Sequence, residues 1–182
     1  MRLFVAIDLP DAIKDELDTL RANVPGATWA KRQAFHLTLR FLGDQILQER
    51  LNPIMTALET VRVSPFEVTL QGVGRFPPAM RGAARVLWVG IAPQPALAEL
   101  YDRIEQALTT VGFSREVNNF RPHITLARLK TSNPTRDINA LLERHATFQA
   151  GPMRVDEFAL FSSVLTAQGS RYKTEEIYKL RG

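Results

Sequence analysis

The sequence predicts a mixed α/β (α+β) fold with two lobes, each a mainly antiparallel sheet with helices on its outer face. Two internal similarities lead to this prediction. The segment RLFVAIDLP beginning at Arg2 resembles RVLWVGIAP beginning at Arg85, because each has a basic residue, an apolar run typical of a strand, and a proline where a helix can begin. The segment HLTLRF beginning at His36 resembles HITLAR beginning at His123, and the two pairs have nearly equal offsets along the chain. This repeated order indicates two lobes related by a pseudo-two-fold axis around a central cleft.

Each copy continues from its opening strand into a helix, a histidine-bearing strand and a second helix. Apolar residues at helical spacing mark the first helix of each copy, at Ile13, Leu17, Leu20 and Val24 and again at Leu97, Leu100, Ile104, Leu108 and Val111. The second helix is marked by Leu47, Leu51, Ile54, Leu58 and Val61 in one copy and by Ile138, Leu141 and Leu142 in the other. Strands are predicted to follow at 65–76, 85–91, 153–163 and 171–180.

The chain length favours one domain over two independent ones. The 182 residues and 45% hydrophobic content are sufficient for one core, and no Gly/Ser linker or low-complexity tract divides the chain. We therefore interpret 1–182 as a single two-lobed domain with approximate repeats 1–84 and 85–182.

Composition excludes several kinds of chemistry. The absence of cysteine excludes disulfides, thiolate nucleophiles and thiolate metal sites, and is typical of a reducing compartment. The apolar run before Asp8 is too short for a signal-peptide core, and no later segment approaches the length of a membrane span, so we expect a cytoplasmic protein without membrane contact. A net charge of +4 mildly favours a polyanionic partner.

The paired His-x-Thr segments predict a site for acid–base catalysis. Side chains alternate along a strand, so His36 and Thr38 face one side, as do His123 and Thr125. A neutral imidazole can take a proton from water, a protonated one can give a proton to a leaving oxygen, and a threonine hydroxyl can donate to an anionic oxygen. This set suits in-line attack on a phosphodiester without a metal ion, and the cationic Arg128 can hold two phosphate oxygens.

The two complete motifs, with strand and helix elements around both, resemble those of the two-histidine phosphoesterase superfamily, and most of all its RNA 2′,3′-cyclic phosphodiesterase (2′-5′ RNA ligase) family. The resemblance covers essentially the whole chain. It implies metal-independent hydrolysis of RNA 2′,3′-cyclic phosphate ends to 2′-phosphomonoesters, with no cofactor. By resemblance, His36 would be the general acid and His123 the general base. Thr38, Thr125 and Arg128 would bind the phosphate, and Phe41 would stack on the terminal base.

Strict alternation conflicts with two of these roles. Phe41 and Arg128 each follow their histidine by five residues, which places them on the opposite strand face unless the strand twists or ends first. Arg40 has the favourable parity, and we consider it a candidate for contact with the RNA backbone.

Other interpretations lead to different expectations. The same site could join RNA ends through a 2′-5′ linkage or hydrolyse a small cyclic nucleotide, and a non-catalytic RNA-end-binding protein is a less favoured alternative. His145 lies near the predicted end of a helix and needs no catalytic role. Neither motif has a carboxylate or third histidine at metal-ligand spacing, so no metal site is predicted. We expect RNA with a cyclic phosphate end as the partner, no protein partner, and a monomer.

Overall fold

The computed structural model describes residues 1–130, 135–166 and 169–182 of the chain. The following elements occur in chain order: β1 (Arg2–Asp8), α1 (Asp11–Asp18), β2 (Ala27–Trp29), β3 (His36–Gly43), α2 (Leu51–Leu58), β4 (Phe66–Phe76), β5 (Val86–Ile91), α3 (Pro95–Thr109), β6 (His123–Leu129), α4 (Thr135–Arg144), β7 (Gln149–Val155), β8 (Glu157–Thr166) and β9 (Gly169–Lys179). Among the described residues, no helix combines the length and apolar character needed to cross a bilayer.

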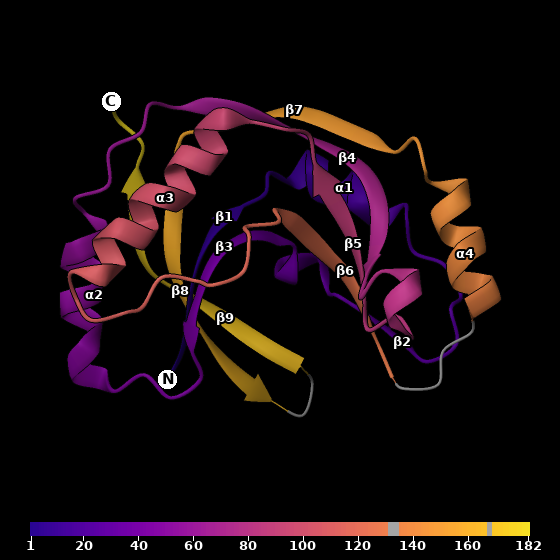
Figure 1. Ribbon diagram of the computed structural model, residues 1–182, viewed down its shortest axis with the longest axis horizontal. Coiled ribbons are helices and arrows are strands. Elements are labelled where there is room, and N and C mark those ends of the chain that lie inside the picture. The colour runs from indigo at the N-terminus through magenta and orange to yellow at the C-terminus, as the bar shows by residue number, and fades with distance from the viewer. Residues whose placement is uncertain (131–134, 167–168) are drawn as a thin grey trace.

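The strands form two antiparallel sheets, which confirms the predicted two-lobed α+β fold (Figure 1). One sheet has the order β3-β1-β8-β9, and the other has the order β2-β6-β5-β4-β7. In each sheet a histidine-bearing strand pairs with the opening strand of its own copy, β3 with β1 and β6 with β5. On their other side β1 pairs with β8 and β5 pairs with β4. Each opening strand therefore pairs with one strand from the other half of the chain.

Two strands differ from the sequence prediction. The segment 153–163, predicted as one strand, is divided at Asp156 between β7, which pairs with β4, and β8, which pairs with β1. The short strand β2 was not predicted, and it lies on the edge of its sheet beside β6. Because the chain passes from one sheet to the other at a single residue, the sequence pattern gives no signal at the crossing.

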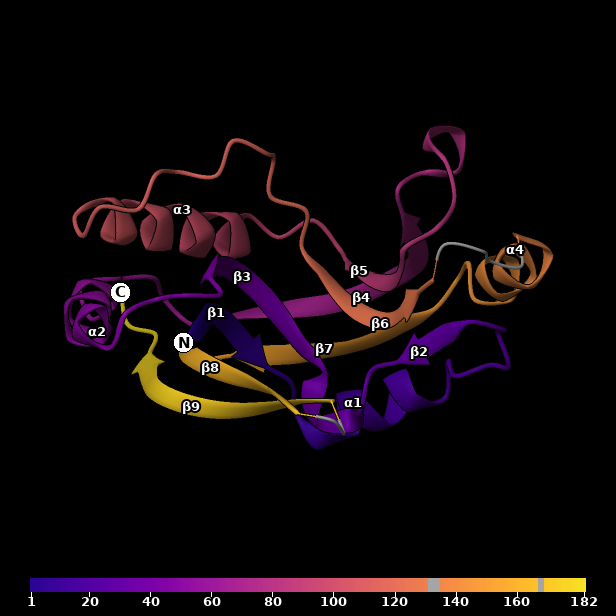
Figure 2. The ribbon, with the colours of Figure 1, turned by 90° about the horizontal axis from the view of Figure 1, so that it is seen from below.

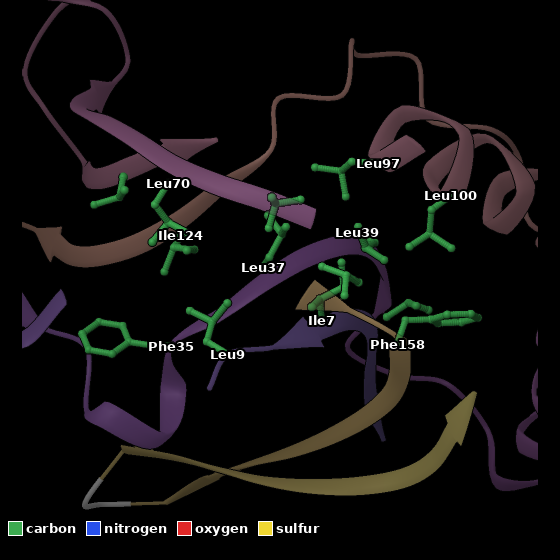
Figure 3. Close-up of a cluster of buried hydrophobic side chains, with 14 of the residues drawn as sticks. Ile7, Leu9, Phe35, Leu37, Leu39, Leu70, Leu97, Leu100, Ile124 and Phe158 are labelled. Carbon is green, nitrogen blue, oxygen red and sulfur yellow. The ribbon is translucent and has the colours of Figure 1, made fainter. Parts of the chain in front are cut away.

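Alternating burial anchors both histidine strands to the core. Leu37 and Leu39 of β3 and Ile124 and Leu126 of β6 are all less than 5% exposed. Figure 3 shows Leu37 and Leu39 among core side chains that include Leu97 and Leu100 of α3. Because neighbouring side chains on a strand point in opposite directions, this packing turns each histidine and threonine away from the core.

Candidate active site

A β-bulge lies at the same place in both histidine strands. In β3, Thr38 is opposite Ala6 and Arg40 is opposite Val5, so Leu39 is an extra residue relative to β1. In β6, Thr125 is opposite Trp88 and Ala127 is opposite Leu87, so Leu126 is the extra residue. Both extra residues come three positions after their histidine. A bulge changes the side-chain parity of the strand beyond it.

This bulge removes the conflict over Phe41. Beyond the bulge Phe41 is opposite Phe4, while Thr38 is opposite Ala6. Phe4 and Ala6 lie on the same face of β1, and residues opposite each other in an antiparallel pair share a face. Phe41 therefore faces the same side as Thr38, and its side chain is 38% exposed.

The same reasoning applies to Arg128 in the other lobe. Arg128 is opposite Val86 and Thr125 is opposite Trp88, and these two partners lie on one face of β5. The expectation that strict alternation turns Arg128 away from its threonine was therefore wrong. The physical reason is the extra residue, which pattern alone does not show.

A cavity of about 610 Å³ brings the two motifs together. Its lining includes His36, Thr38 and Phe41 from the first motif and Thr125 and Arg128 from the second. The remaining predicted residue, His123, does not line this cavity. His123 is opposite Gly90 and so lies on the same face of β6 as Thr125 and Arg128.

Aromatic rings and a backbone carbonyl fix the orientation of the His123 ring. Its ring centroid is 5.0 Å from that of Phe76, almost perpendicular to it, and 6.5 Å from that of Trp88. Its Nδ1 is 2.7 Å from the carbonyl oxygen of Arg121. Because a carbonyl can only accept, Nδ1 carries the proton in this contact, and Nε2 of the neutral ring is free to accept one.

The imidazole of His36 lies in a more apolar environment. Its centroid is 4.9 Å from that of Phe4 and 5.5 Å from that of Tyr172. Burial lowers the pKa of His36 from 6.5 to about 4, a shift that the nearby Asp8 carboxylate and a hydrogen bond to the backbone of Ala34 only partly oppose. In the free protein His36 is therefore neutral at pH 7.

The sequence analysis missed several residues that line the cavity, among them Arg2 and Tyr172. The Arg2 guanidinium lies 4.9 Å from the centroid of the Phe41 ring, and it also lies 3.4 Å from the Asp44 carboxylate. Tyr172 of β9 lines the cavity beside His36. The repeated basic residue at the start of each copy was a signal for Arg2, whereas no sequence pattern pointed to Tyr172.

Arg40 does not face RNA, contrary to our interpretation of its parity. Its side chain is 10% exposed, and its Nε lies 2.7 Å from Oε1 of Glu105, a buried residue of α3. It also contacts the carboxylate of Glu116 and donates to the carbonyl of Ser114 at 2.7 Å. Because it lies just beyond the bulge, Arg40 faces the side opposite Thr38, where it connects β3 to α3 and to the segment before β6.

Arg32, which precedes the first histidine motif by four residues, also forms ion pairs within the protein, with Asp11 at 3.0 Å and with Asp15, both on α1. The backbone amide of His145 donates to the carbonyl of Leu141 just beyond α4, as expected for a residue at a helix end. Within the ranges that the structure describes, no three His, Asp or Glu side chains are grouped so as to hold a metal ion.

Comparisons with known proteins agree on one family. The family model of the 2′-5′ RNA ligase superfamily matches residues 9–166. A protein from Archaeoglobus fulgidus named RNA 2′,3′-cyclic phosphodiesterase is 32% identical, with the alignment covering 98% of this chain and 100% of the relative. The crystal structure of TT0787 from Thermus thermophilus superposes with a TM-score of 0.80 at 28% identity, covering 100% of this chain and 99% of that one. The structure of E. coli LigT complexed with 3′-AMP gives a TM-score of 0.76 at 26% identity, covering 98% and 97%.

Proposed function

The chain belongs to the 2′-5′ RNA ligase superfamily, and from this we propose that it hydrolyses 2′,3′-cyclic phosphate ends of RNA to 2′-phosphomonoesters by metal-independent catalysis with two histidines. The observation that carries the proposal is the single cavity that both motifs line, with His36 and Thr38 from one lobe and Thr125 and Arg128 from the other. The names of the relatives, including RNA 2′,3′-cyclic phosphodiesterase, support the substrate. The complex of E. coli LigT with 3′-AMP supports a ligand that has a phosphate on the ribose of a nucleotide.

In the proposed reaction, Nε2 of His123 removes a proton from water as the water oxygen attacks phosphorus. The bond from phosphorus to O3′ breaks, and protonated His36 gives its proton to O3′. The product has a 2′-phosphate and a free 3′-hydroxyl. Thr38 and Thr125 donate to the non-bridging oxygens, and the Arg128 guanidinium balances the charge that develops on them.

The low pKa of His36 has a role in this sequence. The imidazole is neutral in the empty cavity at pH 7, because burial penalises the imidazolium. A phosphodiester anion in the same cavity favours the charged form by electrostatic attraction. The substrate therefore brings about proton uptake by its own general acid.

Phe41 and Arg2 provide a place for the terminal base. Phe41 is 38% exposed, and one face of its ring is covered by the Arg2 guanidinium. We assign the base to this stack, since aromatic and guanidinium planes both hold unstacked bases in single-stranded RNA.

The proposal is tested with an RNA oligonucleotide that ends in a 2′,3′-cyclic phosphate, incubated with EDTA-treated protein. We expect phosphorus NMR to show conversion to a 2′-phosphomonoester. Replacing His36 or His123 with alanine should each lower kcat by roughly 10² to 10⁴-fold. The matched control is His145→Ala, which removes the third histidine from outside the site and should keep the wild-type rate.

Three results would contradict the proposal. Loss of turnover with EDTA and its recovery with a divalent metal would exclude metal independence. Equal rates for the three alanine variants would exclude the assignment of the acid and the base. Salt-sensitive binding without turnover would instead indicate an RNA-end-binding protein.

A further inference from the structure

A second cavity, of about 390 Å³, adjoins the first at His36. The two cavities share His36, Phe4, Ser170 and Tyr172 in their linings. The second cavity, which we call the upstream cavity, is completed by side chains from five elements: Asp8 of β1, Lys14 of α1, Gln33 of the short 3-10 helix before β3, Phe161 of β8, and Arg171 and Thr174 of β9. Strand β9, which supplies Arg171 and Thr174, lies at the edge of its sheet beside β8 (Figure 2).

The charges of the upstream cavity suit one phosphate. Lys14 and Arg171 supply two cations, and Asp8 supplies one carboxylate. Asp8 Oδ1 lies 2.8 Å from Lys14 Nζ and also accepts a hydrogen bond from the backbone amide of Leu9. Arg171 is exposed and has no ion-pair partner among the described residues. The cavity therefore keeps a net positive charge and an unpaired guanidinium, the group best suited to phosphate oxygens.

Neutral polar groups line the same cavity. Gln33 and Thr174 provide an amide and a hydroxyl, and Phe161 provides an apolar wall. Such a mixture of hydrogen-bonding groups and aromatic rings suits a ribose beside a phosphate better than it suits an isolated inorganic anion.

The chemistry of the proposed reaction sets the direction of the RNA chain. In-line attack places the water opposite the leaving O3′, and therefore on the side away from His36. The upstream phosphate is joined to the terminal ribose through O5′, C5′ and C4′, and C4′ is bonded to the carbon that carries O3′. The chain therefore leaves on the His36 side, since on the other side it would obstruct the water.

We propose that the upstream cavity binds the phosphate and ribose of the nucleotide immediately 5′ to the cyclic phosphate end, with Arg171 contacting that phosphate. This inference rests on the proposed function, because it uses the assignment of His36 to the O3′ side. Binding in the upstream cavity makes the enzyme selective for RNA ends of two or more nucleotides over cyclic mononucleotides.

The test compares kcat/KM for a 2′,3′-cyclic mononucleotide, the matching dinucleotide, and the same dinucleotide with an uncharged methylphosphonate in its upstream linkage. In the wild type we expect the dinucleotide to exceed the mononucleotide by about tenfold, as for one charged hydrogen bond. The methylphosphonate should lose most of this gain. Arg171→Ala should lose it as well, and in this variant the methylphosphonate should have little further effect.

Arg154→Ala is the matched control, because Arg154 is an exposed arginine of β7 that lines neither cavity. It should keep the wild-type preference for the dinucleotide. Equal kcat/KM for the mononucleotide and dinucleotide in the wild type would overturn the inference while leaving the proposed function intact. Additive losses from Arg171→Ala and the methylphosphonate would also overturn it, because they would show that Arg171 acts elsewhere. If no cyclic phosphate were hydrolysed, the proposed function would fail and the inference with it.

Discussion

Replacing Arg40 with alanine should lower the free energy of unfolding by about 3 to 5 kcal/mol, because it leaves a buried carboxylate without its cation. The Glu105 side chain is 3% exposed, and its Oε1 lies 2.7 Å from Arg40 Nε. Without Arg40, the Glu105 carboxylate keeps the hydrogen bond from the backbone amide of Glu116 at 2.8 Å, and the carbonyl of Ser114 loses its donor. A single amide cannot replace a guanidinium beside a carboxylate removed from water.

The measurement is urea unfolding at pH 7 of the wild type, Arg40→Ala, Glu105→Ala and the double variant. In the double variant neither charge is left unpaired, so its loss should be smaller than the sum of the two single losses by at least about 1.5 kcal/mol. The pair Glu99–Arg103, on the exposed face of the same helix, is the control. Its atoms are 3.5 Å apart with about half of each side chain exposed, and its removal should cost about 0.5 kcal/mol or less.

Two results would refute this reasoning. If Arg40→Ala cost less than about 1 kcal/mol, the pair would behave like a surface ion pair. If the two single losses were additive, Arg40 and Glu105 would contribute independently, and the packing of the Arg40 stem would explain its effect.

Three further predictions concern the site. The pKa of His36 is about 4 in the folded protein and 6.5 in the unfolded chain, so unfolding takes up a proton between these pH values. The free energy of unfolding should therefore fall by up to about 3 kcal/mol as the pH is lowered from 6.5 to 4. In urea unfolding, His36→Gln should lose less stability than the wild type over this pH range. An equal loss in both proteins would show that His36 is not the group responsible. Arg128→Lys should recover only part of the kcat lost in Arg128→Ala, because an ammonium cannot hold two oxygens in one plane. Full recovery would show that Arg128 acts only through its positive charge. Phe41→Ala should raise KM by roughly fivefold or more with a smaller change in kcat, as expected for loss of base stacking, and an unchanged KM would remove Phe41 from the binding site.

The sequence predicted the motifs well, because alternation on a strand is a local property. His36 and Thr38 were expected on one face, and both line the cavity. The directions of Phe41 and Arg128 depend on bulges, which arise from how each strand pairs with its neighbour and not from the composition of the strand itself. Local pattern therefore gave the wrong face for the residues beyond the bulge.

Long-range partners explain the remaining differences. The environment of Arg40 is decided by Glu105 of α3 and by Glu116 in the segment before β6, both far along the chain. Tyr172 reaches His36 from the last strand, and the segment 153–163 is divided because its two ends pair with different sheets. None of these contacts produces a periodic pattern in the sequence.

The pairing of β1 with β8 also determines when the protein can fold as it is made. β1 is synthesised before the other strands of its sheet, but its second neighbour, β8, is complete only when the residues up to Thr166 have been made. The sheet that carries His36 is therefore incomplete during most of translation, and so is the wall of the cavity formed by Tyr172 of β9. A nascent chain arrested before β8 should have no active site, and a chaperone that shields the edge of β1 during this interval would protect it from pairing with another chain.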